Sequence, residues 1–209
     1  MRDLKLEKKL FLNNIKILSF NSLLLAMGYV LAVIFMINFS YLTQDMVAFI
    51  GENFFSPIGI IMYTRIPILE YEMKAHEIIY SKISPHFKSV LYRIIIASIE
   101  LIFILSCGFI MLKFFGGKFD YIVILFGTFV TSFYLGTIGM LFSCISKQTM
   151  VGYLVSFIYY FFELFSKGKY TKSFYLFGMT VENYMSKFKL LGIGLVVLIV
   201  CLFIVRKES

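Results

Sequence analysis

The stretch Arg65-Ile-Pro-Ile-Leu-Glu-Tyr-Glu-Met-Lys-Ala-His-Glu-Ile-Ile-Tyr-Ser-Lys82 separates two apolar runs in a sequence that is otherwise mostly apolar. It carries acidic and basic side chains, then the apolar patch Ile78-Ile79-Tyr80, and Pro85 ends the segment. The pattern is compatible with an amphipathic helix, and so many charges are too costly to place in hydrocarbon. We therefore expect this segment to lie in water or against another protein, as a contact surface for a partner.

The composition places the chain in a membrane. Its 209 residues are 60% hydrophobic and 15% charged, whereas soluble domains have about 45–50% apolar and about 25% charged residues. The net charge of +8 comes from basic residues that flank apolar runs. That placement fits the positive-inside rule better than it fits nucleic-acid binding. We predict an all-α integral membrane protein with no nucleic-acid partner.

The apolar runs predict one transmembrane domain over residues 1–209, with a basic amphipathic helix over residues 1–18 in the membrane interface. Residues 42–56 contain Asp45 and Glu52 but no lysine or arginine, so we expect an outer loop there and cytoplasmic termini. The segments long enough to cross a bilayer are six predicted spans, at about residues 19–41, 53–69, 90–112, 121–145, 150–165 and 188–205.

Small and polar residues recur at helical spacing in two of these spans. Thr128, Ser132, Gly136 and Gly139 share one face of the span over residues 121–145, which allows close approach of another helix backbone. A second such face, in the span over residues 150–165, is formed by Gly152, Ser156, Tyr160 and Glu163.

Signatures of catalysis and cofactor binding are missing from the sequence. There is no G-x-x-x-x-G-K-[ST] phosphate loop. Glu72 and His76 have the spacing of two metal ligands on a helix, but two ligands are too few for a site. We expect no enzyme activity, no metal and no cofactor bound by this chain.

Glu100 lies well inside the span predicted over residues 90–112, about two helical turns from Arg93. An ionisable residue at that depth is a functional hypothesis by default. In a structural role Glu100 is neutral or hydrogen-bonds to a neighbouring helix, such as the face with Thr128 and Ser132; in a functional role it is a proton or cation relay.

The residues Glu70-Tyr-Glu72-Met-Lys-Ala-His-Glu77-Ile-Ile resemble the E-x-E-x-G-T-x-E-x-L signature that follows the second span in ABC-2-type permeases. Glu70, Glu72 and Glu77 match, and Lys74-Ala75 stands where the signature has Gly-Thr. The layout is also similar over nearly the whole chain, from the basic N-terminal helix to the semi-apolar outer segment before the last span.

The resemblance implies the membrane subunit of a bacterial ATP-driven exporter in the cell membrane. Such a subunit pairs with a second permease copy or homologue and docks on separate ATPase subunits, which bind ATP and Mg. The coupling helix would be residues 71–81, with a smaller contact at residues 146–149. The ATPase-coupling residues implied in this way are Glu70, Glu72, Lys74, His76, Glu77, Lys147 and Gln148.

The resemblance further implies that the first, second and fifth spans face the translocation path. The residues expected along it are Tyr63, Gly152, Ser156, Tyr160 and Glu163. The expected cargo is an amphipathic molecule, either an antimicrobial peptide, another antibiotic or a lipid. Two other readings stay open: a stand-alone six-span ion-coupled transporter or facilitator that uses Glu100, and a non-transporting membrane partner.

Overall fold

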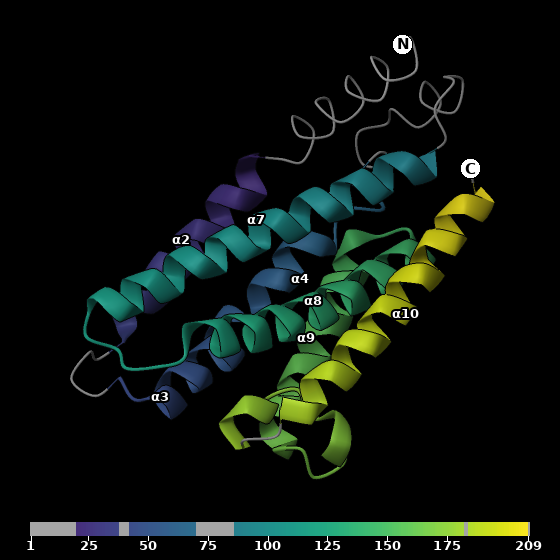
Figure 1. Cartoon of the computed structure of the whole chain (residues 1–209). Coiled ribbons are helices and arrows are strands. Elements are labelled where there is room, and N and C mark those ends of the chain that lie inside the picture. Colours follow the sequence, from purple (N-terminus) through teal and green to yellow (C-terminus); the bar gives the residue numbers. More distant parts are fainter. Residues whose placement is uncertain (1–19, 38–41, 70–85, 182–183, 209) are drawn as a thin grey trace.

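The structure, a computed structural model, describes residues 20–37, 42–69, 86–181 and 184–208 (Figure 1). Within these ranges the chain is helical and has no strand. The predicted interfacial helix at 1–18 and the predicted coupling helix at 71–81 lie outside the described residues. The helical segments are α2 Phe20–Met36, α3 Gln44–Phe49, the π-helix η2 Ile50–Phe55, α4 Pro57–Tyr63, α7 His86–Phe114, α8 Tyr121–Ser146, α9 Thr149–Ser166, the short 3-10 helices η3 Lys172–Phe174 and η4 Gly178–Val181, and α10 Tyr184–Glu208.

Five helical passes in the described part of the chain are long and apolar enough to cross a membrane. They are Gln44–Tyr63, Phe87–Phe114, Tyr121–Ser146, Thr149–Ser166 and Tyr184–Lys207. α2 is apolar but, with 17 residues, shorter than the predicted span over residues 19–41. The chain is thus a multi-pass helical protein of the membrane type, as its composition predicts.

The pass Gln44–Tyr63 corresponds to the second predicted span and is called the second pass from here on; it differs from the prediction of residues 53–69. Its helical path begins at Gln44, runs through α3, η2 and α4, and ends at Tyr63. The prediction that residues 42–56 form an outer loop is therefore wrong. Pro57 lies in the first turn of α4, where a helix tolerates proline, so the helix continues where the sequence suggested a loop.

The last pass also begins earlier than predicted. α10 starts at Tyr184 rather than at residue 188, so Lys187 belongs to the helix and not to the preceding connection. The connection, residues 167–181, contains η3 and η4 and buries Leu176, Phe177 and Met179. The connection is therefore packed against the helices of the bundle.

α8 is the central helix and packs against α4, α7, α9 and α10 (Figure 1). Its predicted small-residue face makes the closest contacts. A Cβ on Gly136 would lie 2.7 Å from the Gly59 carbonyl oxygen of α4, and one on Gly139 would lie 2.3 Å from Thr64 Oγ1. The expected close approach of another helix to this face is confirmed.

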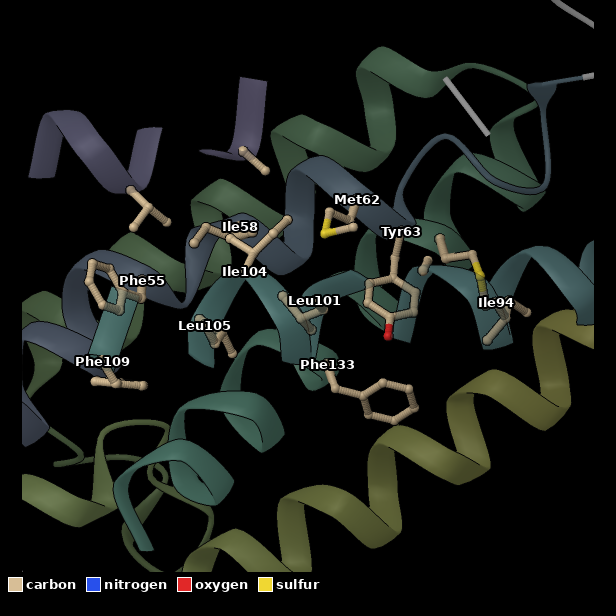
Figure 2. Close-up of a cluster of buried hydrophobic side chains, with 14 of the residues drawn as sticks. Phe55, Ile58, Met62, Tyr63, Ile94, Leu101, Ile104, Leu105, Phe109 and Phe133 are labelled. Atoms are coloured by element: carbon tan, nitrogen blue, oxygen red, sulfur yellow. The ribbon is translucent and has the colours of Figure 1, made fainter. Parts of the chain in front are cut away.

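A hydrophobic core fills the space between the second pass, α7 and α8 (Figure 2). The Phe55 and Phe109 rings meet edge to face with centroids 5.3 Å apart, and the Tyr63 and Phe133 rings do so at 5.7 Å. By contrast, only 22% of the residues of α9 and 28% of those in the most apolar part of α10 are buried, and large apolar side chains of both helices are exposed on the outside of the bundle. Apolar side chains on such an outer surface suit contact with lipid.

The α7–α8 and α9–α10 connections lie at one end of the bundle, which we call the connector end. The Lys118 N–H in the first connection donates to the Leu42 carbonyl just before α3, at 3.2 Å. η4 in the second connection also packs against α3. The α8–α9 turn and the end of α4 lie at the opposite end, because successive passes alternate in direction (Figure 1).

Candidate functional site

Two oppositely charged side chains are buried together at the connector end. Glu52 in η2 and Lys187 in α10 form an ion pair, although both are almost completely enclosed. Lys187 also donates to Thr131 Oγ1 in α8 and to the Leu176 carbonyl in the connection, each at 2.6 Å. The lysine therefore ties α8, α10 and the connection to the second pass.

The carboxylate of Glu52 is held by backbone groups as well as by Lys187. The Met179 N–H lies 3.1 Å from both carboxylate oxygens, and the Thr180 N–H lies 3.3 Å from one of them. Both N–H groups belong to the first turn of η4. A carboxylate that accepts this many hydrogen bonds is well compensated in a buried position.

The π-helix is the local feature that positions Glu52. The Ser56 N–H bonds to the Gly51 carbonyl, five residues back, and Ser56 Oγ donates to the Glu52 carbonyl at 2.5 Å. A π-helical turn adds a residue to the helix and changes which side chains face inward. In this π-helix the side chain of Glu52 points into the protein and is buried.

Tyr160 of α9 satisfies the backbone carbonyl that Pro57 leaves without its usual donor. In a regular α-helix the carbonyl of Asn53 would accept from the N–H of residue 57, and proline has none. The Tyr160 hydroxyl donates to that carbonyl at 2.5 Å. This bond fixes the end of α9 against η2.

We expect Tyr160→Phe to lower the free energy of unfolding by about 1–3 kcal/mol, because it leaves a buried carbonyl oxygen without a donor. Denaturant-induced unfolding in detergent micelles measures the change. Tyr170→Phe is the matched control, since Tyr170 is largely exposed, and it should leave stability unchanged. Equal effects of the two substitutions would contradict the role given to the Tyr160 hydroxyl.

Glu163, near the end of α9, is a second buried carboxylate at the connector end. One of its oxygens accepts from Thr171 Oγ1 at 3.1 Å and from the Leu176 N–H at 3.5 Å. Its other oxygen has no hydrogen-bond partner among the described residues. Glu163 thus fastens the connection to α9, as Glu52 fastens it to η2.

The predicted face of Gly152, Ser156, Tyr160 and Glu163 does lie on one side of α9, and that side is buried. A Cβ on Gly152 would lie 1.9 Å from Ser143 Oγ, and Ser156 Oγ donates to the Leu135 carbonyl at 3.2 Å. Tyr63, the remaining residue of the predicted path, is in the core, with its hydroxyl 2.7 Å from Ser98 Oγ. Within the single chain these residues form helix contacts, and Tyr160 also lines a cavity.

The other predicted site residues are at different places. Lys147 and Gln148 form the turn between α8 and α9, where Lys147 adopts a left-handed conformation with φ of 55°. Glu100 is partly exposed on α7, and Ser132 Oγ donates to the Thr128 carbonyl of its own helix rather than to Glu100. Glu70, Glu72, Lys74, His76 and Glu77 lie outside the described residues.

Two of the cavities at the connector end lie next to these buried polar groups. One, of about 530 Å³, lies between η2, α9 and the connection. The other, of about 410 Å³, lies between α8 and α10 and reaches Lys187. The buried ion pair therefore stands beside one cavity, and the bond between Tyr160 and Asn53 stands beside the other.

The sequence-based reading missed Glu52 and Lys187 because it placed both in outer, water-exposed segments. A partial signal was present: Pro57 follows Glu52 within two turns, and a proline marks a place where a helix departs from regular geometry. No such signal could have paired Glu52 with Lys187, because they meet only through the packing of η2 and α10.

The fold and this site define a multi-pass helical protein of the membrane type with a buried ion pair that anchors a connection between two passes. No family model matches the sequence, and neither a curated protein nor a solved structure matches it.

Proposed function

We propose that this chain is the membrane-spanning permease subunit of an ATP-driven exporter, similar to the ABC-2-type permeases. It would act in the bacterial cell membrane, with both termini in the cytoplasm, paired with a second permease copy or homologue. The acidic signature of Glu70, Glu72 and Glu77 between the second and third passes carries the proposal. ATP and Mg would be bound by separate ATPase subunits.

The arrangement of the passes supports this proposal. The signature follows Leu69 and precedes α7, so it is attached to the end of the bundle opposite the connector end. The turn with Lys147 and Gln148 belongs to the same end. The residues that flank the signature and the Lys147–Gln148 turn are thus at the same end of the bundle, which is compatible with a single partner reaching both contacts that the resemblance implies.

The packed connection before the last pass supports it as well. The resemblance includes a semi-apolar outer segment at this place, and residues 167–181 contain two short helices with buried apolar side chains. Non-regular backbone close to a membrane is tolerated when it is packed against protein. In the proposed orientation this connector end faces outward, where cargo would leave.

The test is copurification of an ATPase with the detergent-solubilised chain from its native membrane. We expect the amount of ATPase that copurifies with the double variant Glu72→Lys/Glu77→Lys to fall by at least about tenfold. Disrupting close charge pairs at an interface costs about 2–5 kcal/mol. The control is Asp45→Lys/Asp120→Lys, which makes the same change of charge at the connector end.

Two results would contradict the exporter proposal. One is an ATPase complex that tolerates the signature variant as well as the control. The other is pH-dependent transport by the purified chain alone that is lost in Glu100→Gln, which would favour a stand-alone ion-coupled transporter.

A further inference from the structure

The larger cavity at the connector end has the dimensions of a ligand site. Its volume of about 530 Å³ falls in the range of about 300–1,000 Å³ that is usual for small-molecule pockets. Three separate parts of the chain line it: the second pass, the end of α9, and the connection. The lining residues are Phe49, Asn53, Phe54, Tyr160, Leu164, Lys167, Tyr175, Phe177, Thr180 and Val181.

Half of the ten lining residues are aromatic, and their rings pack against one another. Phe177 meets Tyr160 edge to face at 5.8 Å and Tyr175 at 5.7 Å. On the other side, Phe49 and Phe54 meet at 6.0 Å. Edge-to-face pairs are favourable ring geometries, and an aromatic wall favours an apolar body in the cavity.

The cavity has a buried floor and an exposed rim. Asn53, Tyr160 and Phe177 are buried, and the hydrogen bond from the Tyr160 hydroxyl to the Asn53 carbonyl fixes the floor. Phe54 and Val181 at the rim are 45% and 64% exposed. A ligand could therefore enter from the membrane or from outside without displacing the core, as in sites that are formed before binding.

The charge at the rim is positive. Among the described residues that line the cavity, Lys167 alone carries a full charge, and it is exposed where α9 ends. Lys169 and Lys172 follow in the connection, and no acidic residue occurs between residues 164 and 181. Two carboxylates among the described residues at this end are engaged within the protein: Glu52 pairs with Lys187, and Glu163 accepts from Thr171 and Leu176. Glu182, which follows Val181 in the sequence, lies outside the described residues.

We propose that this cavity binds an anionic amphiphile, with its apolar body against the aromatic wall and its negatively charged headgroup at Lys167. A fatty acid and a single-chain phospholipid share this chemistry. A cationic peptide would place its charge beside the lysines of the rim, where like charges repel. Binding of such a molecule does not depend on the proposed function. The further idea that the bound molecule is exported cargo does rest on the proposed function.

The experiment uses a reporter tryptophan, which is specific because the chain has no tryptophan of its own. Phe54→Trp places the reporter at the rim of the cavity. Phe165→Trp places it on the lipid-facing side of α9, 78% exposed and outside the cavity. The probes are 11-bromoundecanoic acid and 11-bromoundecylamine, which have the same brominated chain and opposite charge, added to the purified chain in nonionic micelles.

We expect saturable quenching of the Phe54→Trp reporter by the acid, and weak, non-saturable quenching by the amine. Adding Lys167→Met should weaken binding of the acid by at least about tenfold, because a charged hydrogen bond is lost. Adding Lys169→Met instead should change it little, since Lys169 does not line the cavity. A saturating level of single-chain phospholipid should displace the acid if the cavity accepts both sources of headgroup.

Equal quenching by the acid and the amine, or equal saturable quenching at Phe165→Trp, would overturn the proposal, since it would show general partition into the micelle. Insensitivity to Lys167→Met would overturn the assignment of the headgroup. The quenching assay contains no ATPase, so a negative result in it does not contradict the exporter proposal. Failure to copurify an ATPase likewise does not contradict ligand binding in this cavity.

Discussion

Lys187→Met is expected to lower the free energy of unfolding by about 3–5 kcal/mol, the usual cost of removing one partner of a buried ion pair. The substitution keeps the length of the side chain but leaves the carboxylate of Glu52 enclosed without its cation. It also removes the bonds to Thr131 and Leu176, which hold the connection against α8. The midpoint of SDS-induced unfolding from mixed micelles measures the loss.

Two further variants separate the pair from a general effect of losing a lysine. Glu52→Gln/Lys187→Met removes both charges, and it should recover most of the lost stability, because a neutral replacement of a buried pair is often tolerated. Lys189→Met removes an exposed lysine from the same helix and should have little effect. A double variant as unstable as Lys187→Met would contradict the view that an uncompensated charge causes the loss.

Gly59→Ala is expected to lower the free energy of unfolding by about 1–3 kcal/mol or more, the range for overpacked cores. A Cβ on Gly59 would lie 1.9 Å from the Ser132 carbonyl oxygen and 2.4 Å from its carbonyl carbon. Both atoms belong to the backbone of α8 and cannot move aside by a side-chain rotation. α4 and α8 would have to separate at the contact on which the centre of the bundle depends.

Gly28→Ala in α2 is the matched control, because no atom lies within 4 Å of the added Cβ. Alanine is the better helix former by about 0.8–1.0 kcal/mol, so this variant should be at least as stable as the parent chain. Measuring both by the same unfolding titration tests packing rather than helix propensity. Equal losses in the two variants would contradict the close contact between α4 and α8.

The sequence predicted the helical passes that depend on local hydrophobicity. α8, observed at Tyr121–Ser146, was predicted over residues 121–145, and α9, observed at Thr149–Ser166, over residues 150–165. An apolar run that is long enough to cross hydrocarbon must satisfy its own backbone polar groups, and a helix does so within the segment. The small-residue face of α8 could be read in the same way, because helical spacing is also a local property.

The beginnings of the second and last passes could not be read in this way. A rule based on charge placed Glu52 and Lys187 in water, since either residue alone would be too costly in a buried position near a membrane. The tertiary structure brings each beside the other and adds the N–H groups of Met179 and Thr180. Burial of one charge thus depends on the position of the other.

That this chain is a bundle of apolar helices can be derived from the sequence alone, because length, hydrophobicity and helical spacing are properties of each segment. The connector end, with its ion pair, its packed connection and its aromatic cavity, becomes visible only in the folded chain. Those features depend on side chains from η2, α8, α9 and α10 that are far apart in the sequence. Which of these side chains meet depends on how the helices pack, so no single segment of the sequence predicts the contacts.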